Sequence, residues 1–430
     1  TAGGNQQAQP DQETQVHWQA SLFGWWCLIS GCAGRSADRA LPSVTPPPVV
    51  RPGIEVLLSD SLQLVQGRQV GLVTNQSGVD SRGVSDVERL RAAGVALVAL
   101  FSPEHGFRGT AAPGAAIASS TDSATGLPIY SLYGRNSSPT DSMLAGVEVL
   151  LVDLQDAGAR YFTYLFTTVE VMRAAARRGI PVVVLDRPDP IGALVQGNVL
   201  DTAYASPVGV LAIPMRPGMT LGELARLARS DLGIEVDLRV VPVAGWRRTE
   251  AWSVTGLPFI APSPNLRTLE SLYHYPGLCL FEGTALSVGR GSDAPFEQVG
   301  AAWLDTTAVL ARLQAAGLAG VSFRGVSFTP RAPGDGKSAD TLVAGIRFTV
   351  TDPAQYDPTL TAVTLLAILQ AMDPGRLGLS APQFDRLAGG PSLRAAILAG
   401  ETPGAIAASW SGPRGAFENR RRPFLLYPSY

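Results

Sequence analysis

The sequence predicts an α/β protein in which a Rossmann-like, doubly wound parallel sheet is followed by a second, smaller α+β domain. Two observations predict this fold class. Near-continuous runs of Val, Leu, Ile and Ala alternate with stretches of helical periodicity, and such runs are typical of strands buried on both faces of a parallel sheet. From about residue 273 the alternation gives way to a glycine-rich segment and a different order of elements, which indicates a second domain.

The first domain, residues 53–272, repeats a strand-like run followed by an amphipathic stretch. The run at 69–74 is followed by a stretch at 84–93 that ends at Gly94, as expected of a helix with a glycine stop. A long irregular stretch at 109–145 is rich in Gly, Ala, Ser and Thr, and we expect it to lie over the site. Further strands are expected at 95–101, 148–153, 181–185 and 236–243, and further helices at 164–178 and 219–233.

The second domain, residues 273–430, begins with a loop-like, glycine-dense segment at 275–300. After it we expect helices at 306–316 and 358–372, strands at 320–328 and 341–350, and short terminal helices within 391–410. This order is typical of an α+β domain. Because sites commonly lie between domains, the glycine-dense segment is a candidate site, with Glu282, Arg290, Asp293 and Glu297.

Residues 1–52 differ from the rest of the chain. An apolar run at 18–31 suits the core of a signal peptide and is too short for a stable spanning helix. It ends in Leu-Ile-Ser-Gly-Cys32, which resembles the bacterial lipobox, whose cysteine is lipidated. A tether rich in Pro, Ser and Ala follows at 36–52. We therefore expect a periplasmic or cell-envelope lipoprotein attached through Cys32, or a secreted protein if the leader is cleaved without lipidation.

Four of the apolar runs in the first domain stop at a cluster of polar side chains. In open α/β sheets the ligand lies outside the carboxyl ends of the strands, so these clusters are expected to meet in one crevice. The side chains are those of Asn75, Gln76, Glu104, His105, Asp153, Gln155, Asp156, Arg160, Asp186 and Arg187.

Composition and missing motifs exclude several functions. With 34 Lys plus Arg against 36 Asp plus Glu, the chain is close to neutral, which argues against a nucleic-acid binder. Three cysteines and three histidines, without zinc spacing, argue against a disulfide framework and a histidine-rich metal site. There is no Gly-x-Gly-x-x-Gly after the first strand, no P-loop and no Gly-x-Ser-x-Gly elbow. We therefore expect neither a metal nor a nucleotide cofactor. The remaining candidate is catalysis by the carboxyl groups of Asp and Glu.

Paired carboxyl groups suit glycoside cleavage, in which one group protonates the leaving oxygen while the sugar carbon is stabilised or attacked from the other side. Most of the acids have a structural alternative. Asp153 and Asp156 would cap a helix, Asp186 would order a turn, and Glu282 would pair with an arginine. Glu104 is the leading catalytic candidate because it stands directly at a strand end, in a Pro-Glu-His-Gly turn.

Several motifs at these positions together resemble the exo-β-N-acetylmuramidases of the NamZ type, a family formerly known only as a domain of unknown function. The resemblance runs from about Gly53 to the end of the chain. The motifs are Ser102–Gly109 (SPEHGFRG), Asp153–Asp156 (DLQD), Arg160–Tyr164 (RYFTY), Asp186–Pro188 (DRP), Pro262–Asn265 (PSPN), Tyr275–Thr284 (YPGLCLFEGT), Gly289–Gly291 (GRG), Pro295–Glu297 (PFE) and Arg422–Tyr427 (RPFLLY).

The resemblance implies a glycosidase of peptidoglycan recycling, which removes N-acetylmuramic acid from the non-reducing end of fragments such as MurNAc-GlcNAc and muropeptides, without nucleotide or metal. Glu104 matches the glutamate taken as catalytic in the family motif. Glu282 and Glu297 are the candidates for a second catalytic carboxylate. Ala285 departs from the asparagine that commonly follows Glu-Gly-Thr, which puts substrate contacts at that position in doubt.

The functional groups of that substrate select binding candidates. The lactyl carboxylate calls for an arginine able to bind it bidentately, and Arg160, Arg187 and Arg290 are available. The acetamide group calls for amide partners such as Asn75, Gln76 and Asn265. Tyr164, with Tyr161 and Phe162, would either face the sugar ring or pack in the core.

Alternatives remain open at this point. The 2-acetamido group of the substrate can act as an internal nucleophile, in which case Glu104 is the acid and a second acid only orients the acetamide. A different class of function is a non-catalytic lipoprotein that binds muropeptides. A third is a metal-dependent hydrolase that would use Glu104, His105 and Asp153. Contact with a membrane is expected only through the lipid anchor.

Overall fold

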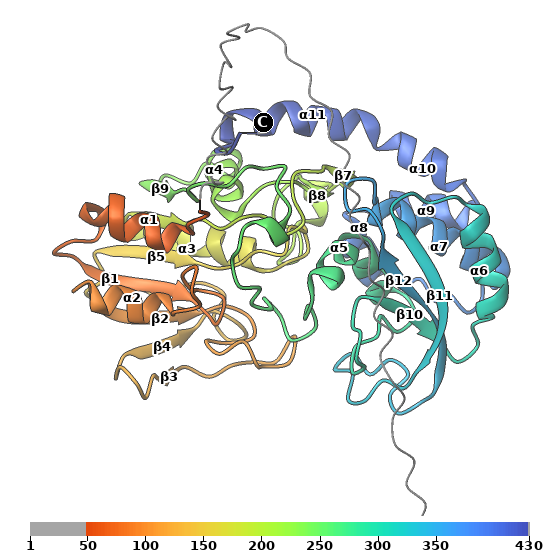
Figure 1. Cartoon of the computed structure of the whole chain (residues 1–430), viewed down its shortest axis with the longest axis horizontal. Coiled ribbons are helices and arrows are strands. Elements are labelled where there is room, and N and C mark those ends of the chain that lie inside the picture. The colour runs from red at the N-terminus through yellow and green to blue at the C-terminus, as the bar shows by residue number, and fades with distance from the viewer. Residues whose placement is uncertain (1–48, 429–430) are drawn as a thin grey trace, which may run out of the picture. The chain divides into compact units, whose positions relative to one another are not determined.

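A seven-stranded sheet forms the N-terminal half of the computed structural model, which describes residues 49–428 (Figure 1). Its strand order is β3-β4-β2-β1-β5-β6-β9, and all neighbours are parallel except β3 and β4. The chain builds outward from β1 on one side and from β5 on the other, so these two strands meet at the topological switch point. The predicted Rossmann-like, doubly wound sheet is thereby confirmed. The strands are β1 (Gln69–Thr74), β2 (Ala96–Ser102), β3 (Ser120–Thr121), β4 (Pro128–Ser131), β5 (Val149–Asp153), β6 (Val182–Leu185) and β9 (Leu238–Val241).

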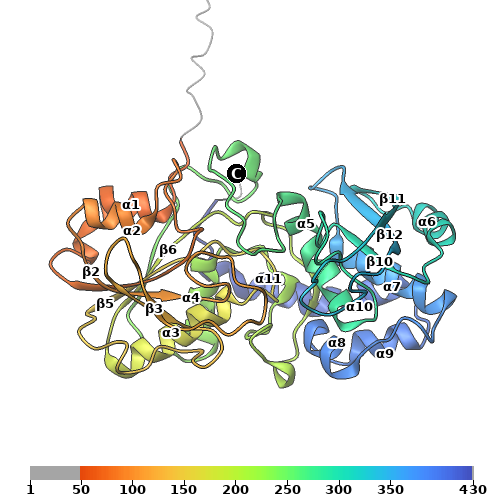
Figure 2. The same ribbon diagram turned by 90° about the horizontal axis from the view of Figure 1, so that it is seen from below.

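Helices cover both faces of this sheet (Figure 2). On one face α1 (Gly53–Asp60) and α2 (Asp86–Ala92) bury their apolar residues against the strands. On the other face α3 (Tyr164–Arg178) and α4 (Leu221–Asp231) belong to the larger apolar core. The strand at 69–74 and the helix at 164–178 have the predicted bounds, and the other predicted elements of this half end within two residues of theirs. Helix α1 was not predicted.

Local chemistry fixes these helix ends. At the start of α4 the Thr220 side chain accepts the N–H of Glu223, whose carboxylate accepts the N–H of Thr220 in return. Helix α3 ends at Gly179, whose φ of 64° lies in the left-handed region that glycine adopts without strain. The stretch at 109–145, predicted as irregular, contributes β3 and β4 to the edge of the sheet, and a separate pair, β7 (Gln196–Val199) and β8 (Pro214–Arg216), was also not predicted. Short 3-10 turns at η1 (Leu62–Leu64), η2 (Thr202–Tyr204) and η3 (Trp252–Val254) complete this half.

The C-terminal half contains an antiparallel sheet of three strands in the order β10-β12-β11, as expected of an α+β unit (Figure 1). Helices α5 and α6 contact this sheet, and α7 packs against both of them. The elements are α5 (Leu269–Leu278), η4 (Cys279–Gly283), β10 (Gln298–Ala301), α6 (Thr306–Ala315), β11 (Val321–Phe328), β12 (Val343–Val350), α7 (Pro358–Met372), α8 (Ala381–Ala388), α9 (Ser392–Leu398), α10 (Pro403–Ser409), α11 (Ser411–Arg421) and η5 (Arg422–Phe424).

One sequence prediction for this half was wrong. The segment at 275–300 does not begin as a loop, because α5 runs through Pro276 to Leu278 and continues directly into η4. Pro-Gly is usually a turn signal, but here Gly277 lets α7 approach: a Cβ on Gly277 would stand 2.0 Å from the carbonyl oxygen of Pro358. This tertiary requirement has no local sequence signal. Helices α8 and α11 were also not predicted.

The two halves share one apolar core, which extends from Val73 in β1 to Phe417 in α11. Helices α10 and α11 then lead the chain back from the C-terminal half to the N-terminal half, where α4 and β9 lie (Figure 1). There Arg421 donates to the carbonyls of Pro217 and Gly218, at 2.8 Å each. No helix within residues 49–428 is both long and apolar enough to cross a membrane. Cys32 and the leader lie outside the described residues.

Candidate functional site

Glu104 stands in a tight turn that directly follows β2. The turn is closed by hydrogen bonds from Gly106 N–H to the Pro103 carbonyl (3.0 Å) and from Ala111 N–H to the His105 carbonyl (3.1 Å). His105 has a φ of 71°, which is unusual for a residue with a side chain and marks a backbone that the surrounding structure constrains. The buried strand thus ends in a rigid turn that presents Glu104, partly exposed, at the carboxyl edge of the sheet.

Three hydrogen-bond donors converge on the Glu104 carboxylate. Thr163, at the start of α3, donates its hydroxyl to Oε2 at 2.8 Å, and the Gly114 N–H donates to Oε1 at 3.1 Å. Burial, together with the charge of Glu104 and a hydrogen bond to it, raises the pKa of Tyr133 to about 12. We call Glu104, Tyr133, Thr163 and Gly114 the Glu104 cluster. It joins residues that follow β2, precede α3 and lie in the stretch predicted to be irregular.

His105 faces its own turn. Its ring is buried, and Nδ1 lies 2.9 Å from the Ala111 carbonyl, to which it donates. Burial lowers the pKa of His105; the nearby carboxylate of Glu104 opposes this shift, and the charge of Arg290 adds to it. The last effect places Arg290, from the C-terminal half, within electrostatic reach of the Glu104 turn.

The polar residues that follow β1 and β5 form a buried network beside the cluster. Asn75 accepts the N–H and the hydroxyl of Ser77 at 2.9 and 2.6 Å, and donates to the Tyr164 hydroxyl at 2.6 Å. Tyr164 in turn donates to the Pro262 carbonyl at 2.8 Å. Gln155 donates its amide to the carbonyls of Asp156 and Pro188, both at 3.0 Å. The polar groups of Asn75, Gln155 and Tyr164 are therefore satisfied within the protein, and Asn75 also lines a neighbouring cavity.

Two of the three arginines predicted for the lactyl carboxylate, Arg160 and Arg187, are buried and bonded to other parts of the protein. The buried Arg160 guanidinium donates to the carbonyls of Asn198, Ile213 and Leu387 at 2.8, 3.0 and 2.9 Å. Arg187 pairs with Asp153, with Nε–Oδ1 at 2.5 Å and Nη2–Oδ2 at 3.0 Å. Both geometries favour structural roles.

Asp186 is also committed to the fold. Its carboxylate accepts the Thr220 hydroxyl at 2.6 Å, the Gly222 N–H at 2.8 Å and the Tyr427 hydroxyl at 2.5 Å. It thereby ties the start of α4 and the end of the chain to β6, and it is not exposed at all. The sequence suggested that Asp186 would order a turn, but it did not indicate these partners, because they come from distant segments.

The C-terminal half contributes a second group of charged residues. Glu282 pairs with Arg290, whose Nε lies 2.7 Å from Oε1, and the guanidinium lies over the Phe296 ring, 5.0 Å from its centroid. Lys337 donates to the carbonyls of Phe281 and Glu282 at 2.9 Å each and so stabilises the backbone that carries Glu282. The Arg290 side chain remains 12% exposed and has no hydrogen-bond partner for Nη1 within residues 49–428. Of the three arginines, Arg290 is the most exposed, since Arg160 and Arg187 are only 3% and 7% exposed.

Within residues 49–428, the remaining predicted residues make no hydrogen bond or ion pair with the Glu104 cluster. Glu297 accepts the Thr268 hydroxyl at 2.5 Å and pairs with Arg347 at 3.0 Å, and none of these contacts involves the Glu104 cluster. Asp293 is exposed. Asn265 lies in the loop that receives the Tyr164 hydroxyl, and its side-chain amide has no partner among the described residues. Asn265 is therefore available to a ligand.

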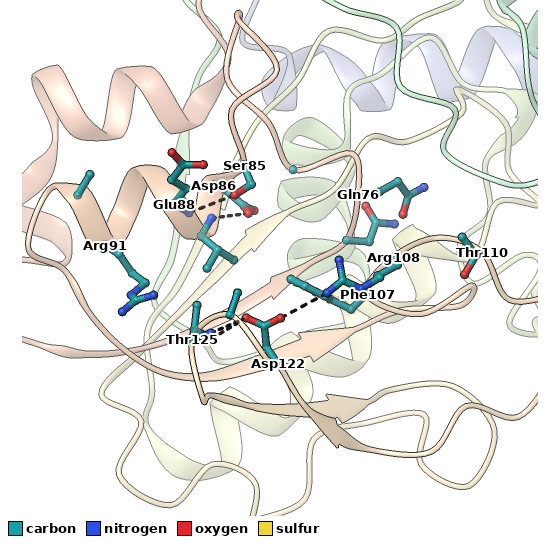
Figure 3. A pocket seen from close by; sticks show the side chains of 15 residues that line it. Gln76, Ser85, Asp86, Glu88, Arg91, Phe107, Arg108, Thr110, Asp122 and Thr125 are labelled. Carbon is teal, nitrogen blue, oxygen red and sulfur yellow. Dashed lines mark hydrogen bonds and ion pairs between the residues drawn. The ribbon is translucent and has the colours of Figure 1, made fainter.

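A cavity of about 950 Å³ lies next to the Glu104 turn, and Glu104 is not among the residues that line it (Figure 3). Phe107, Arg108 and Thr110 line it from that turn, and Gln76 lines it from the end of β1. We treat the Glu104 cluster and the cavity separately, because the three donors converge on Glu104 and none of its contacts lies in the cavity lining. No group of three or more His, Cys, Asp or Glu side chains in the described part of the chain is arranged to hold a metal.

Sequence reasoning missed Tyr133 and named Thr163 only as part of a motif. Tyr133 follows β4, a strand of only four residues within the stretch predicted as irregular. The apolar run Leu127–Leu132 that precedes Tyr133 is a signal that could have identified both the strand and the polar residue at its end.

Asp156 gives the fold a pH dependence. Burial raises the pKa of Asp156 to about 7; the N–H of Gly158 opposes the shift, and the charge of Asp189 adds to it. Between its ordinary value of 3.8 and about 7 the folded protein holds a proton that the unfolded chain has lost, so the free energy of unfolding falls as pH rises through this range. We expect Asp156→Asn, which keeps the acceptor for Gly158, to reduce this slope in urea titrations at pH 5 to 8. Asp293→Asn, at an exposed carboxylate, is the matched control; equal slopes in all three proteins would contradict the assignment.

Comparisons with known proteins identify one family over nearly the whole described chain. The family model for the N-terminal domain of exo-beta-N-acetylmuramidase NamZ matches residues 70–270, and the model for its C-terminal domain matches residues 273–427. The peptidoglycan beta-N-acetylmuramidase NamZ of Bacillus subtilis (strain 168) is 40% identical over 383 residues, which cover 88% of this chain and 92% of that protein.

Two crystal structures of DUF1343 family proteins from Bacteroides fragilis NCTC 9343 share the fold. One superposes with a TM-score of 0.81 at 31% identity, over 88% of this chain and 99% of that one. The other has a TM-score of 0.72 at 30% identity, over 89% of this chain and 100% of that one.

Proposed function

This chain belongs to the exo-β-N-acetylmuramidase NamZ family, and from that membership we propose that the Glu104 cluster is its catalytic centre. The protein is a glycosidase that acts on peptidoglycan fragments and releases N-acetylmuramic acid from their non-reducing ends. The observation that supports the placement of the site is the convergence of three donors on one partly exposed carboxylate at the carboxyl edge of the sheet.

The cluster fits the first step of glycoside cleavage. Glu104, when protonated, would give its proton to the glycosidic oxygen as the bond from that oxygen to the sugar C1 breaks. Thr163 and Tyr133 fix the carboxyl group in one orientation, which general acid catalysis requires. Glu282 is the better-placed second carboxylate, since its partner Arg290 reaches the Glu104 turn electrostatically, whereas the contacts of Glu297 lead to Thr268 and Arg347.

The function is tested by incubating the purified protein with the disaccharide MurNAc-GlcNAc and measuring free N-acetylmuramic acid. Release of the monosaccharide is expected, as is the absence of release from GlcNAc-MurNAc, whose non-reducing sugar is the other one. A protein that binds the first disaccharide without cleaving it would instead be the non-catalytic muropeptide binder.

Arg290 is proposed to bind the lactyl carboxylate, because it is the most exposed of the three candidate arginines and its Nη1 has no hydrogen-bond partner within residues 49–428. Losing a charge-assisted hydrogen bond costs about 1.5–3 kcal/mol, so we expect Arg290→Gln to raise KM about 10- to 150-fold. The control is a substrate whose lactyl group is a methyl ester, which removes the anionic partner. On the ester, wild type and variant should have similar kcat/KM. An equal loss on both substrates would mean that Arg290 acts only through Glu282.

We also propose that the protein is attached to the cell envelope through a lipid on Cys32. The support is the apolar run at 18–31, its lipobox-like end and the tether that follows. Labelled palmitate should be incorporated into the full chain expressed in a bacterium with a lipoprotein pathway, and Cys32→Ala should abolish incorporation. Equal labelling of both proteins would contradict the anchor, and recovery of the full chain only from the cytosol would contradict the location.

A further inference from the structure

The cavity beside the Glu104 turn has no role in the site described above. Its volume of about 950 Å³ is at the upper end of the range of ligand pockets. Figure 3 shows it between α2, which contributes Glu88 and Arg91, and two loops, which contribute Phe107, Arg108 and Asp122. A cavity of this size next to the carboxylate of Glu104 is large enough to bind part of a substrate.

The cavity and the Glu104 cluster are close along the chain and through contacts. Phe107 is three residues after Glu104, so their Cα atoms are at most about 11 Å apart. Asn75 lines the cavity and also donates a hydrogen bond to Tyr164. Tyr164 directly follows Thr163, which belongs to the Glu104 cluster. A substrate that reaches Glu104 would therefore extend into the cavity.

The cavity contains polar groups that the protein does not satisfy. Gln76 donates its amide N–H to the Ala261 carbonyl at 2.9 Å, but its Oε1 is buried without a hydrogen-bond partner. Such an orphaned acceptor is costly unless a ligand donates to it. Arg91 has no ion pair among the described residues, and Arg108 has only a long contact of 3.7 Å to Asp122, whose carboxylate already accepts the N–H and hydroxyl of Thr125.

The lining has the character of a peptide site. It combines two arginines, the acids Glu88 and Asp122, an orphaned amide oxygen and aliphatic surface, with Phe107 as its one aromatic ring. A sugar ring would call for aromatic faces and neutral hydroxyl partners, whereas a short peptide brings carboxylates, an amino group and amide N–H donors together. Glycan strands of peptidoglycan carry such a peptide on the lactyl group of muramic acid.

We infer that this cavity binds the stem peptide on the next muramic acid of the leaving strand. The inference rests on the proposed function. An exo-acting enzyme holds one sugar on the non-reducing side of the cleaved bond, so whatever extends beyond that sugar belongs to its lactyl substituent or to the leaving strand. Since Arg290 is assigned to the free lactyl carboxylate of the terminal sugar, the peptide in the cavity comes from the leaving strand.

The test compares three substrates: the disaccharide MurNAc-GlcNAc, the peptide-free tetrasaccharide, and the tetrasaccharide with a stem peptide on its second muramic acid only. Two ionic contacts at a partly exposed surface correspond to a preference of about 5- to 30-fold in kcat/KM for the peptide-bearing tetrasaccharide over the peptide-free one. Arg91→Ala/Arg108→Ala should bring this ratio close to one. Arg312→Ala, at an exposed arginine on α6 without side-chain contacts among residues 49–428, should leave the ratio as in wild type.

A wild-type ratio of one, or a ratio that the double variant does not change, overturns the inference. If the two arginines govern instead a preference for the peptide-free tetrasaccharide over the disaccharide, the occupant is the second lactyl carboxylate rather than the peptide, and the inference is also wrong. Failure of the proposed function looks different, since no substrate is cleaved. In that case calorimetric binding of the same two tetrasaccharides to wild type and the double variant still tests the cavity.

Discussion

Glu104→Gln is expected to lower turnover of MurNAc-GlcNAc by about 10²- to 10⁴-fold, the usual share of general acid catalysis. Glutamine keeps the size of the side chain and loses the proton that reaches the leaving oxygen. Its carbonyl can accept the Gly114 N–H, and its amide can donate to Thr163 and Tyr133, whose hydroxyls also act as acceptors. The variant should therefore unfold at the same urea concentration as wild type and bind the disaccharide with similar affinity.

A substrate with a good leaving group separates acid catalysis from other losses. The 4-nitrophenyl β-glycoside of N-acetylmuramic acid needs little protonation of its leaving oxygen. Glu104→Gln should therefore lower the rate of the first step less on this substrate than on the disaccharide. Matched losses on both substrates would indicate that Glu104 acts in another step or holds the site together. Near-normal activity on the disaccharide would make Glu104 a structural residue, with Glu282 next to be tested.

Arg187→Met is expected to destabilise the fold by about 3–5 kcal/mol, because it leaves the carboxylate of Asp153 buried without its partner. The pair is almost fully enclosed, with side-chain exposures of 7% for Arg187 and 1% for Asp153. Burial raises the pKa of Asp153 and Arg187 opposes that shift, so the deficit of the variant should shrink as pH falls and Asp153 takes up a proton. Urea unfolding at pH 5 and pH 8 measures both effects.

The matched control removes both charges. Asp153→Asn/Arg187→Met should recover most of the lost stability, because replacing both members of a buried pair leaves no uncompensated charge. The same proteins test the earlier alternative for Arg187. If Arg187 were the ligand of the lactyl carboxylate, Arg187→Met would raise KM and leave the free energy of unfolding nearly unchanged.

The sequence alone determined the central sheet, the catalytic candidate and the family. The strand Gln69–Thr74 and the helix Tyr164–Arg178 were predicted with the right bounds, since a strand buried on both faces and a helix with a glycine stop each have a local pattern. Glu104 was identified because position at a strand end is itself a local property. The resemblance to exo-β-N-acetylmuramidases needed only the order of short motifs.

Only the tertiary structure decided which of the predicted polar residues are occupied by partners within the fold. Arg160, Arg187 and Asp186 look equivalent to Glu104 and Arg290 in the sequence, yet their partners are the carbonyl of Leu387, the carboxylate of Asp153 and the hydroxyl of Tyr427. Two of these three partners are more than 200 residues away along the chain. A charged group is structural or functional according to whether burial and partners satisfy it, and those conditions depend on contacts between distant segments that no local pattern records.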